Sequence, residues 1–247
     1  MYNTAATYLH FFWAGLVKHG QTGGIMPSQR FLITKMIAPV PQSYRGQVIE
    51  LGAGNGALTL RLAARCPEAR ILACEINPAL ARDHRRNLAD AGLSGRVELL
   101  AGPAAALLAD LGKSGLEKPD FIISGIPLGN LGREKALVLI DTIRQTLCEG
   151  GMYIQFQHSL LDRKKIRTRF TRVRTVPAFL NFPPAVVYYA AKVIPDSSGD
   201  EFGDEVGHAC RQAADQGRLQ RALQLRNAGE MALHKAKHGQ RQQCDGG

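Results

Sequence analysis

Long apolar runs are missing from this sequence of 247 residues. Its longest apolar stretches, such as Ala185–Ala191 and Phe121–Ile123, are far shorter than the ~20 residues that a membrane-spanning helix needs. A basic region followed by an apolar run, the mark of a secretory signal, is also missing from the N-terminus. We therefore expect neither a transmembrane helix nor a secretory segment.

Cysteine is scarce and scattered. The five cysteines are odd in number and contain no CxxC spacing, which excludes the usual disulfide frameworks and structural zinc sites. They are Cys66, Cys74, Cys148, Cys210 and Cys244. This pattern favours a reducing cytoplasm and a protein without a bound metal.

Acidic residues are fewer than basic ones. The chain has 31 Lys and Arg against 21 Asp and Glu, for a net charge of +10. From Asp196 onward, seven basic and eight acidic residues contribute −1, so the preceding residues carry +11. A positive field of this kind attracts polyanions, which include nucleic acids and anionic lipid surfaces.

Short apolar runs alternate with helical patterns between Gln47 and Ile194, which is typical of an α/β protein with a parallel sheet. The predicted strands are Gln47–Leu51, Arg70–Glu75, Arg96–Leu100, Asp120–Ser124, Met152–Gln157, Thr168–Val176 and Val186–Val193. The predicted helices are Ala57–Arg65, Pro78–Ala91, Ala104–Leu111 and Arg133–Cys148. Only a short loop with Asn181, Phe182, Pro183 and Pro184 joins the last two strands, which indicates an antiparallel hairpin.

Three parts of the chain are expected. Residues 1–40 would form an N-terminal helical lid, with an aromatic helix at Tyr2–Lys18 and a second helix starting after Pro27-Ser28. Residues 41–195 would form a Rossmann-like domain with a seven-stranded, mostly parallel sheet and an antiparallel last strand. Residues 196–247 would form a polar extension, partly helical around Arg218–Lys237 or disordered.

A glycine-rich motif, Glu50-Leu51-Gly52-Ala53-Gly54-Asn55-Gly56, lies between a predicted strand and a predicted helix. Its glycines permit unusual dihedral angles and allow a ligand to approach the backbone. Glu50 could meet a cationic amino group, and Glu75, which ends the next strand, could accept hydrogen bonds from two ribose hydroxyls. A tight turn with a surface acid is the structural alternative.

These residues resemble motifs I and II of class I methyltransferases, and the antiparallel last strand agrees with that fold. The resemblance implies that S-adenosyl-L-methionine is the cofactor. It places the cofactor against the following residues: Glu50, Gly52, Ala53, Gly54, Asn55, Gly56, Glu75, Ile76 and Ser124. Many relatives carry an acid after the third strand to hold adenine. Here Gly102-Pro103-Ala104 stands there instead, so backbone groups around Ala101–Ala104 would recognise the base.

The loop after the fourth predicted strand, Ser124-Gly125-Ile126-Pro127-Leu128, occupies the place of the catalytic loop. Methyltransferases acting on nucleobases usually present Asn or Asp, then Pro, then an aromatic residue that stacks on the base. Gly125 and Leu128 replace the amide and the aromatic residue, so this loop offers a planar base neither a polar side chain to bond nor a ring to stack on.

The same loop resembles the Ser-Gly-Leu-Pro-Leu of bacterial phospholipid N-methyltransferases of the peripheral type. Further resemblance comes from Lys18–Ser28, from Gln155-Phe156 and from Leu180–Tyr188. It implies methylation of the amine of phosphatidylethanolamine and its methylated forms, towards phosphatidylcholine. Gln157-His158 departs from the Thr-Tyr common in that family, which leaves ornithine-lipid N-methylation as an alternative.

Methyl transfer needs an unprotonated amine held in line with the sulfonium methyl group. The candidates that orient this amine are Ser124, the carbonyl groups of Gly125 and Ile126 in the Pro127 loop, and His158. His158 is also a candidate base, or an ordinary exposed histidine.

Seven basic residues occur in twelve between Arg163 and Arg174 without an acid among them. Together with aromatic residues near the N-terminus, they favour docking on an anionic membrane at its cytoplasmic face. The residues chosen for this contact are Phe11, Trp13, Lys18, Arg163, Lys164, Lys165 and Arg167. A solvated face, simple packing of the aromatics and an RNA phosphate track are the alternatives.

Two rival functions stay open from the sequence. An RNA adenine or protein amine methyltransferase would use the same cofactor, and RNA would bind the same basic run. A cofactor-binding adaptor that has lost catalysis would bind the cofactor without turnover.

Overall fold

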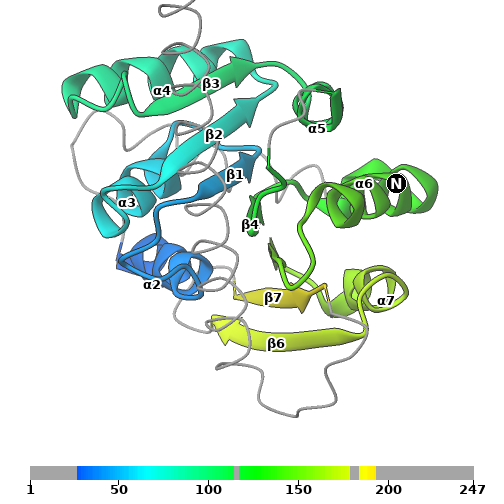
Figure 1. The fold of residues 1–247 in the computed structure, drawn as a ribbon. Coiled ribbons are helices and arrows are strands. Elements are labelled where there is room, and N and C mark those ends of the chain that lie inside the picture. The colour runs from blue at the N-terminus through cyan, green and yellow to red at the C-terminus, as the bar shows by residue number, and fades with distance from the viewer. Residues whose placement is uncertain (1–26, 114–116, 179–183, 193–247) are drawn as a thin grey trace, which may run out of the picture. The chain divides into compact units, whose positions relative to one another are not determined.

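The computed structural model describes residues 27–113, 117–178 and 184–192. A seven-stranded sheet runs through this part of the chain in the order β3-β2-β1-β4-β5-β7-β6 (Figure 1). The strands are β1 (Gln47–Leu51), β2 (Arg70–Glu75), β3 (Val97–Ala101), β4 (Phe121–Ser124), β5 (Met152–Gln157), β6 (Arg172–Ala178) and β7 (Ala185–Ala191). The α-helices are α2 (Pro27–Ile37), α3 (Ala57–Arg65), α4 (Pro78–Asp90), α5 (Ala104–Lys113), α6 (Arg133–Thr146) and α7 (Arg163–Arg167). Two 3-10 helices are η1 (Leu128–Leu131) and η2 (Leu160–Asp162).

Strands β1 to β5 pair in parallel, and β7 is antiparallel to both β5 and β6. The antiparallel last strand is therefore confirmed. The link from β6 to β7 is too short for the crossover helix that a parallel pair would need.

The strand order reverses at β1, which lies between β2 and β4. The chain moves outward from β1 through β2 to β3, and then crosses to β4 on the other side. In such sheets ligands bind beyond the carboxyl ends of the strands at this switch point. The loops after β1 and β4 are therefore the ones that the fold places at a binding crevice.

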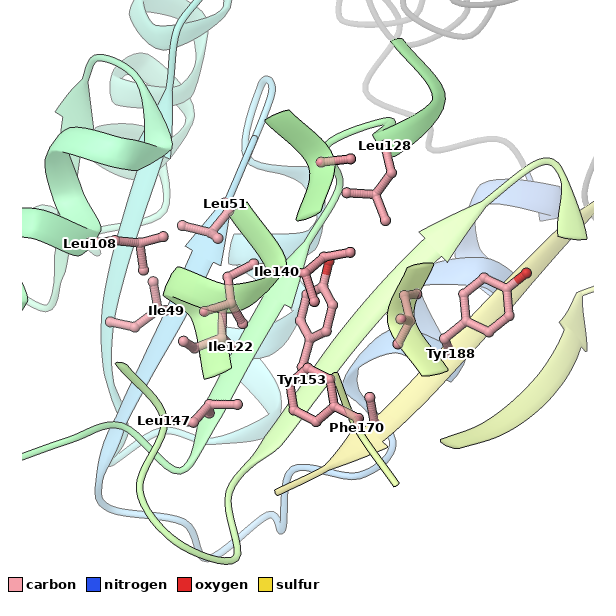
Figure 2. Close-up of a cluster of buried hydrophobic side chains, with 14 of the residues drawn as sticks. Ile49, Leu51, Leu108, Ile122, Leu128, Ile140, Leu147, Tyr153, Phe170 and Tyr188 are labelled. Carbon is pink, nitrogen blue, oxygen red and sulfur yellow. The ribbon is translucent and has the colours of Figure 1, made fainter. Parts of the chain in front are cut away.

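Helices cover both faces of the sheet. Figure 1 shows α2, α3 and α4 on one side and α5, α6 and α7 on the other. The close-up in Figure 2 shows the core under the second group, where Leu108 of α5 and Ile140 of α6 lie against Ile49, Ile122 and Tyr153 of the strands. All five side chains are at most 2% exposed. Burial of this kind is worth about 1.5–3 kcal/mol for each large apolar side chain.

The predicted strand Thr168–Val176 is wrong in its first half. The chain forms η2 and α7 after β5, and β6 begins only at Arg172. Ser159 starts this helical segment because its hydroxyl oxygen accepts a hydrogen bond from the Leu161 amide. Ile166 and Phe170, four residues apart, are both buried, which is a helical spacing that the surrounding basic residues obscured. Both 3-10 helices were likewise absent from the prediction.

The other predicted elements agree with the structure to within three residues at either end. The helix expected after Pro27-Ser28 is α2. The predicted aromatic helix Tyr2–Lys18, the loop residues Asn181–Pro183 and the extension 196–247 lie outside the described residues. The expected division into three parts thus stays a prediction. Within the described segments, no helix combines the length and apolar character needed to cross a bilayer.

Candidate active site

The glycine-rich motif forms a tight loop over the end of β2. Gly52, Gly54 and Gly56 have φ angles of 71°, 60° and 88°, a region that side-chain-bearing residues rarely adopt. The amides of Gly52 and Ala53 donate to the Cys74 carbonyl oxygen at 3.0 and 2.9 Å. The loop therefore depends on glycine for its conformation and is anchored to the neighbouring strand.

His84, on α4, packs beneath this loop. A Cβ atom at Gly56 would overlap its imidazole ring, so the third glycine of the motif makes room for a side chain. His84 is fully buried, and neither ring nitrogen has a hydrogen-bond partner in the described structure. Burial, with a smaller effect of Arg85, lowers its pKa to about 4, which keeps the ring neutral. His84 was not among the predicted site residues, although its spacing from Leu80 and Leu88 matches the buried face of a helix.

Glu75 links the glycine loop to the start of α4. Its side chain is only 3% exposed, and its two oxygens accept hydrogen bonds from the amides of Gly54 and Asn77, both at 2.8 Å. Asn77 in turn caps α4 by accepting from the amides of Ala79 and Leu80. Each carboxylate oxygen retains a further lone pair, and Glu75 lines the groove described below.

Glu50 lies on the other side of the glycine loop. It is 3% exposed, and the Thr59 hydroxyl donates a hydrogen bond to Oε2 at 2.6 Å. Burial raises the pKa of this carboxyl to about 8; the Thr59 hydrogen bond lowers it and the charge of Glu75 raises it further. A carboxyl with this pKa is mostly protonated at neutral pH and ionises when a cation lies beside it.

Two hollows meet at the switch point. A small cavity of about 80 Å³ is lined by Glu50, by residues of α2 and by Phe156. An open groove of about 1400 Å³ is lined by Glu75, Ile76 and parts of α5 and α6. Gly52 and Gly125 line both hollows, so they stand at the junction.

The predicted cofactor residues divide between these hollows. Those lining the small cavity are Glu50, Gly52, Ala53, Gly54 and Asn55. Those lining the groove are Gly52, Glu75, Ile76, Gly102, Pro103 and Ala104. Gly56 and Ser124 line neither in the described structure. The fold thus brings most of the predicted set together around one opening.

The predicted catalytic loop approaches the glycine loop closely at Gly125. The Gly125 amide donates to the Leu51 carbonyl oxygen at 2.9 Å, and a Cβ atom at Gly125 would lie 2.9 Å from the Gly52 carbonyl oxygen. Such a contact is shorter than real Cβ atoms make with backbone. The close approach of the two loops therefore requires glycine at this position, whatever acceptor the enzyme binds.

Ser124 and Ile126 are held by the protein itself. Ser124 is fully buried. Its hydroxyl oxygen accepts a hydrogen bond from the Ile126 amide at 3.2 Å, and its side chain is also hydrogen-bonded to Tyr153. The Ile126 carbonyl oxygen accepts from the side-chain amides of Gln155 at 3.0 Å and Gln157 at 3.2 Å. These two glutamines were not among the predicted site residues, because nothing in the neighbouring sequence shows that they reach the loop after β4.

His158 stands at the exposed end of β5. Its Nδ1 lies 3.1 Å from the Pro184 carbonyl oxygen, and its ring meets Phe156 edge-on with centroids 5.3 Å apart. Phe156 lines the small cavity, whereas His158 lines neither of the two hollows.

The predicted membrane residues are only partly described. Lys164 and Arg167 are exposed and Arg163 is half-buried, while Lys165 forms an ion pair with Asp162 at 2.6 Å. Phe11, Trp13 and Lys18 lie outside the described residues.

The residues at the opening fit S-adenosylmethionine. The loop of Gly52 and Gly54 offers backbone without side chains, and the Glu50 carboxyl suits a ligand with a cationic amino group. The Glu75 lone pairs suit a ribose diol, and Ile76, which is 70% exposed, offers an apolar surface for adenine. Among the described residues no cluster of three potential metal ligands occurs.

Comparisons with known proteins agree with this site. Residues 48–151 match the family model described as a methyltransferase domain. The ornithine lipid N-methyltransferase of Singulisphaera acidiphila is 28% identical over 185 residues, which cover 74% of this chain and 95% of that protein.

Solved structures share the fold. A SAM-dependent methyltransferase from Agrobacterium tumefaciens superimposes with a TM-score of 0.55 at 14% identity, covering 68% of this chain and 63% of that one. The precorrin-6y C5,15-methyltransferase of Geobacter metallireducens GS-15 gives a TM-score of 0.50 at 17% identity, covering 64% and 86%.

The matched segment contains the glycine loop, Glu75 and the Gly125 loop, which together form the opening of the site. The chain therefore carries a class I methyltransferase domain of Rossmann-like fold and is an S-adenosylmethionine-dependent methyltransferase.

Proposed function

We propose that this enzyme methylates the primary amine in the headgroup of a polar membrane lipid. The observation that carries the proposal is the loop after β4. Leu128 is fully buried in the core (Figure 2), so the loop offers no ring face to a nucleobase at that position. Gly125 offers no side-chain amide. This loop suits a small aliphatic amine better than a planar base.

The curated relative supports the same acceptor class. That relative is an ornithine lipid N-methyltransferase, and the match spans nearly its whole length. Ornithine lipid and phosphatidylethanolamine both present a primary ammonium group at the end of a polar headgroup. The relative favours ornithine lipid, whereas the resemblance of residues 124–128 to phospholipid N-methyltransferases favours phosphatidylethanolamine.

The walls of the small cavity suit the chemistry. Ile123 and Phe156 line it with apolar surface, which favours the free amine of an acceptor that contacts them, whereas Glu50 in the same cavity suits the amino group of the cofactor. S-adenosylmethionine, when bound, supplies a methyl group on a sulfonium. The amine lone pair forms the new N–C bond while the C–S bond breaks and its electrons pass to sulfur, and the nitrogen gives up one proton to water.

Anionic lipid is proposed as the partner surface, at the inner face of the membrane. The net charge of +10 and the exposed cations Lys164 and Arg167 support this choice. The substrate would then be reached from the bilayer surface.

The test supplies the full-length enzyme with methyl-labelled cofactor and one acceptor at a time: phosphatidylethanolamine, ornithine lipid, or ribosomal RNA. We expect label in at least one of the lipids and none in the RNA. The relative rates on the two lipids would identify the headgroup. Label in RNA alone, with both lipids unmodified, would contradict the proposal.

A further inference from the structure

Two exposed leucines follow β5. Leu160 is 58% exposed and Leu161 is 85% exposed, and both belong to η2. A single exposed leucine is ordinary on a protein surface, because much of that surface is apolar. Two in succession, directly before a basic helix, form an amphipathic feature that fold stability does not require.

Cations without a partner lie next to this pair. In the part of the chain that the structure describes, three basic residues of α7 form no ion pair: Arg163, Lys164 and Arg167. Nearby cations are neutralised instead, Lys165 by Asp162 at 2.6 Å and Arg169 by Asp141 at 2.5 Å. The net positive charge of this segment is therefore concentrated beside the leucines.

The leucines lie beside the loop that carries the acceptor chemistry. Asp162, the last residue of η2, is 4% exposed, and a Cβ atom at Gly129 of η1 would lie 3.6 Å from its Oδ2. On the other side, the Tyr188 hydroxyl donates to the Ser159 carbonyl oxygen at 3.2 Å. The segment is thus held between the continuation of the β4 loop and β7.

We propose that Leu160, Leu161, Arg163, Lys164 and Arg167 form a docking surface for an anionic phospholipid bilayer, defined here as the leucine–arginine surface. The two leucines enter the acyl boundary, and the cations contact lipid phosphates. This inference rests on the proposed function, because a lipid amine must reach the loop after β4 while its acyl chains stay in the bilayer.

The chemistry of the surface favours lipid over RNA. Both polyanions would attract the cations. Single-stranded RNA is held by aromatic side chains that stack on its bases, and leucine has no flat face to offer. Aliphatic side chains are instead the groups that partition into the acyl boundary of a bilayer.

The test measures partition of the full-length protein onto vesicles of phosphatidylcholine with about 30% phosphatidylglycerol. Leu160→Ser with Leu161→Ser should weaken this partition about 10–100-fold, because two aliphatic side chains no longer leave water. Lys164→Gln with Arg167→Gln should weaken it about 10-fold or more and reduce its salt dependence. Arg82→Gln with Arg85→Gln, two exposed cations of α4 that line neither hollow, is the matched control for the cation pair and should behave as the parent.

Activity separates this proposal from the function on which it rests. The leucine variant should methylate a short-chain, water-dispersed form of whichever lipid amine the parent accepts at the parental rate, and lose activity on the same lipid amine incorporated into the vesicles. Parental partition of the leucine variant, or a loss in Arg82→Gln with Arg85→Gln equal to that in Lys164→Gln with Arg167→Gln, would overturn the docking surface. If the parent binds a single-stranded RNA oligonucleotide more tightly than it binds the vesicles, and the leucine variant loses this RNA binding, the partner of the surface is RNA and the proposal is overturned. A parent that binds vesicles through these residues but methylates no lipid amine would leave the docking surface standing and contradict only the proposed function.

Discussion

At the scale of single residues, the site depends on where side chains are missing and on which carboxylates are buried. Gly52 and Gly125 allow two loops from different strands to touch, and Glu75 uses both of its oxygens to hold backbone amides. Each of these positions tolerates little change, because its neighbours are backbone atoms that cannot move aside independently.

Glu75→Gln should weaken S-adenosylmethionine binding about 10–100-fold. Both carboxylate oxygens accept from amides, so the NH₂ group of glutamine would have to face a donor at either Gly54 or Asn77. Isothermal calorimetry measures the affinity. Glu98→Gln, at an exposed position of β3 that pairs with Arg70, is the matched control and should leave the affinity unchanged. If Glu75→Gln binds the cofactor with the parental affinity, Glu75 does not contribute to the cofactor site.

Gly125→Ala should lower both cofactor affinity and turnover by about 10-fold or more. Its Cβ atom would meet the Gly52 carbonyl oxygen at 2.9 Å and push the two loops apart, and overpacking of this kind commonly costs about 1–3 kcal/mol. Gly129→Ala is the control, because its Cβ would lie 3.6 Å from Asp162, an ordinary contact. Equal effects of the two substitutions on affinity would show that the close approach at Gly125 is unimportant.

At the scale of elements, β5 contributes more than a buried strand. All six of its residues are buried, yet they include Tyr153, Gln155 and Gln157. The Tyr153 hydroxyl donates to Gln155, and both glutamines donate to the Ile126 carbonyl oxygen on the loop after β4. A polar group buried without a partner is costly, so this network is satisfied only when the loop lies in place.

Gln157→Leu should lower kcat by up to about 10-fold and leave the cofactor dissociation constant nearly unchanged. The substitution removes one of two donors to the Ile126 carbonyl, and one such hydrogen bond is worth about 0.5–1.5 kcal/mol. Steady-state kinetics and calorimetry would separate the two quantities. Gln145→Leu, at an exposed position on α6, should change neither. If kcat of Gln157→Leu equals that of the parent, the glutamine does not position the loop.

At the scale of the whole molecule, two buried groups give stability opposite dependences on pH. Glu50 has its pKa raised from 4.5 to about 8, so the stability that its protonated form gives is lost as pH rises through that range. His84 has its pKa lowered from 6.5 to about 4, so stability is lost as pH falls from 6.5 towards 4. The two effects oppose each other between about pH 4.5 and 6.5.

The His84 effect is isolated by His84→Leu. In the parent the buried neutral ring should cost up to about 3 kcal/mol of stability on acidification from pH 6.5 to 4, a loss that the variant lacks. Urea unfolding at a series of pH values measures the difference in slope. Gln145→Leu, which changes an exposed side chain that does not titrate, should keep the parental slope. Identical slopes in the parent and His84→Leu would mean that the ring is not buried in neutral form.

The Glu50 effect appears above pH 6.5, where His84 no longer titrates. Without cofactor, the free energy of unfolding should fall by about 1.4 kcal/mol per pH unit towards pH 8, and Glu50→Gln should flatten this fall. Cofactor affinity should rise over the same interval, because a cationic ligand favours the ionised carboxyl. Affinity measured by calorimetry that is independent of pH in the parent would contradict a protonated Glu50.

Much of the fold was predictable because its signals are local. The strands β1, β2 and β5 have the predicted bounds, since short apolar runs between turn residues depend on neighbours along the chain. The prediction failed after β5, where the spacing of Ile166 and Phe170 was hidden in a basic run. With only Ile166 and Phe170 as buried apolar residues, the neighbouring sequence does not distinguish a charged helix from a charged strand at the edge of the sheet.

The sequence by itself determined the glycine loop and Glu75 at the end of β2, because backbone dihedral angles and strand ends are properties of adjacent residues. The tertiary structure alone decided the rest: His84 beneath Gly56, the burial that raises the pKa of Glu50, and the hold of Gln155 and Gln157 on Ile126. These features join residues far apart in the chain, and their energies come from desolvation and contact, which exist only once the sheet has brought its strand ends together.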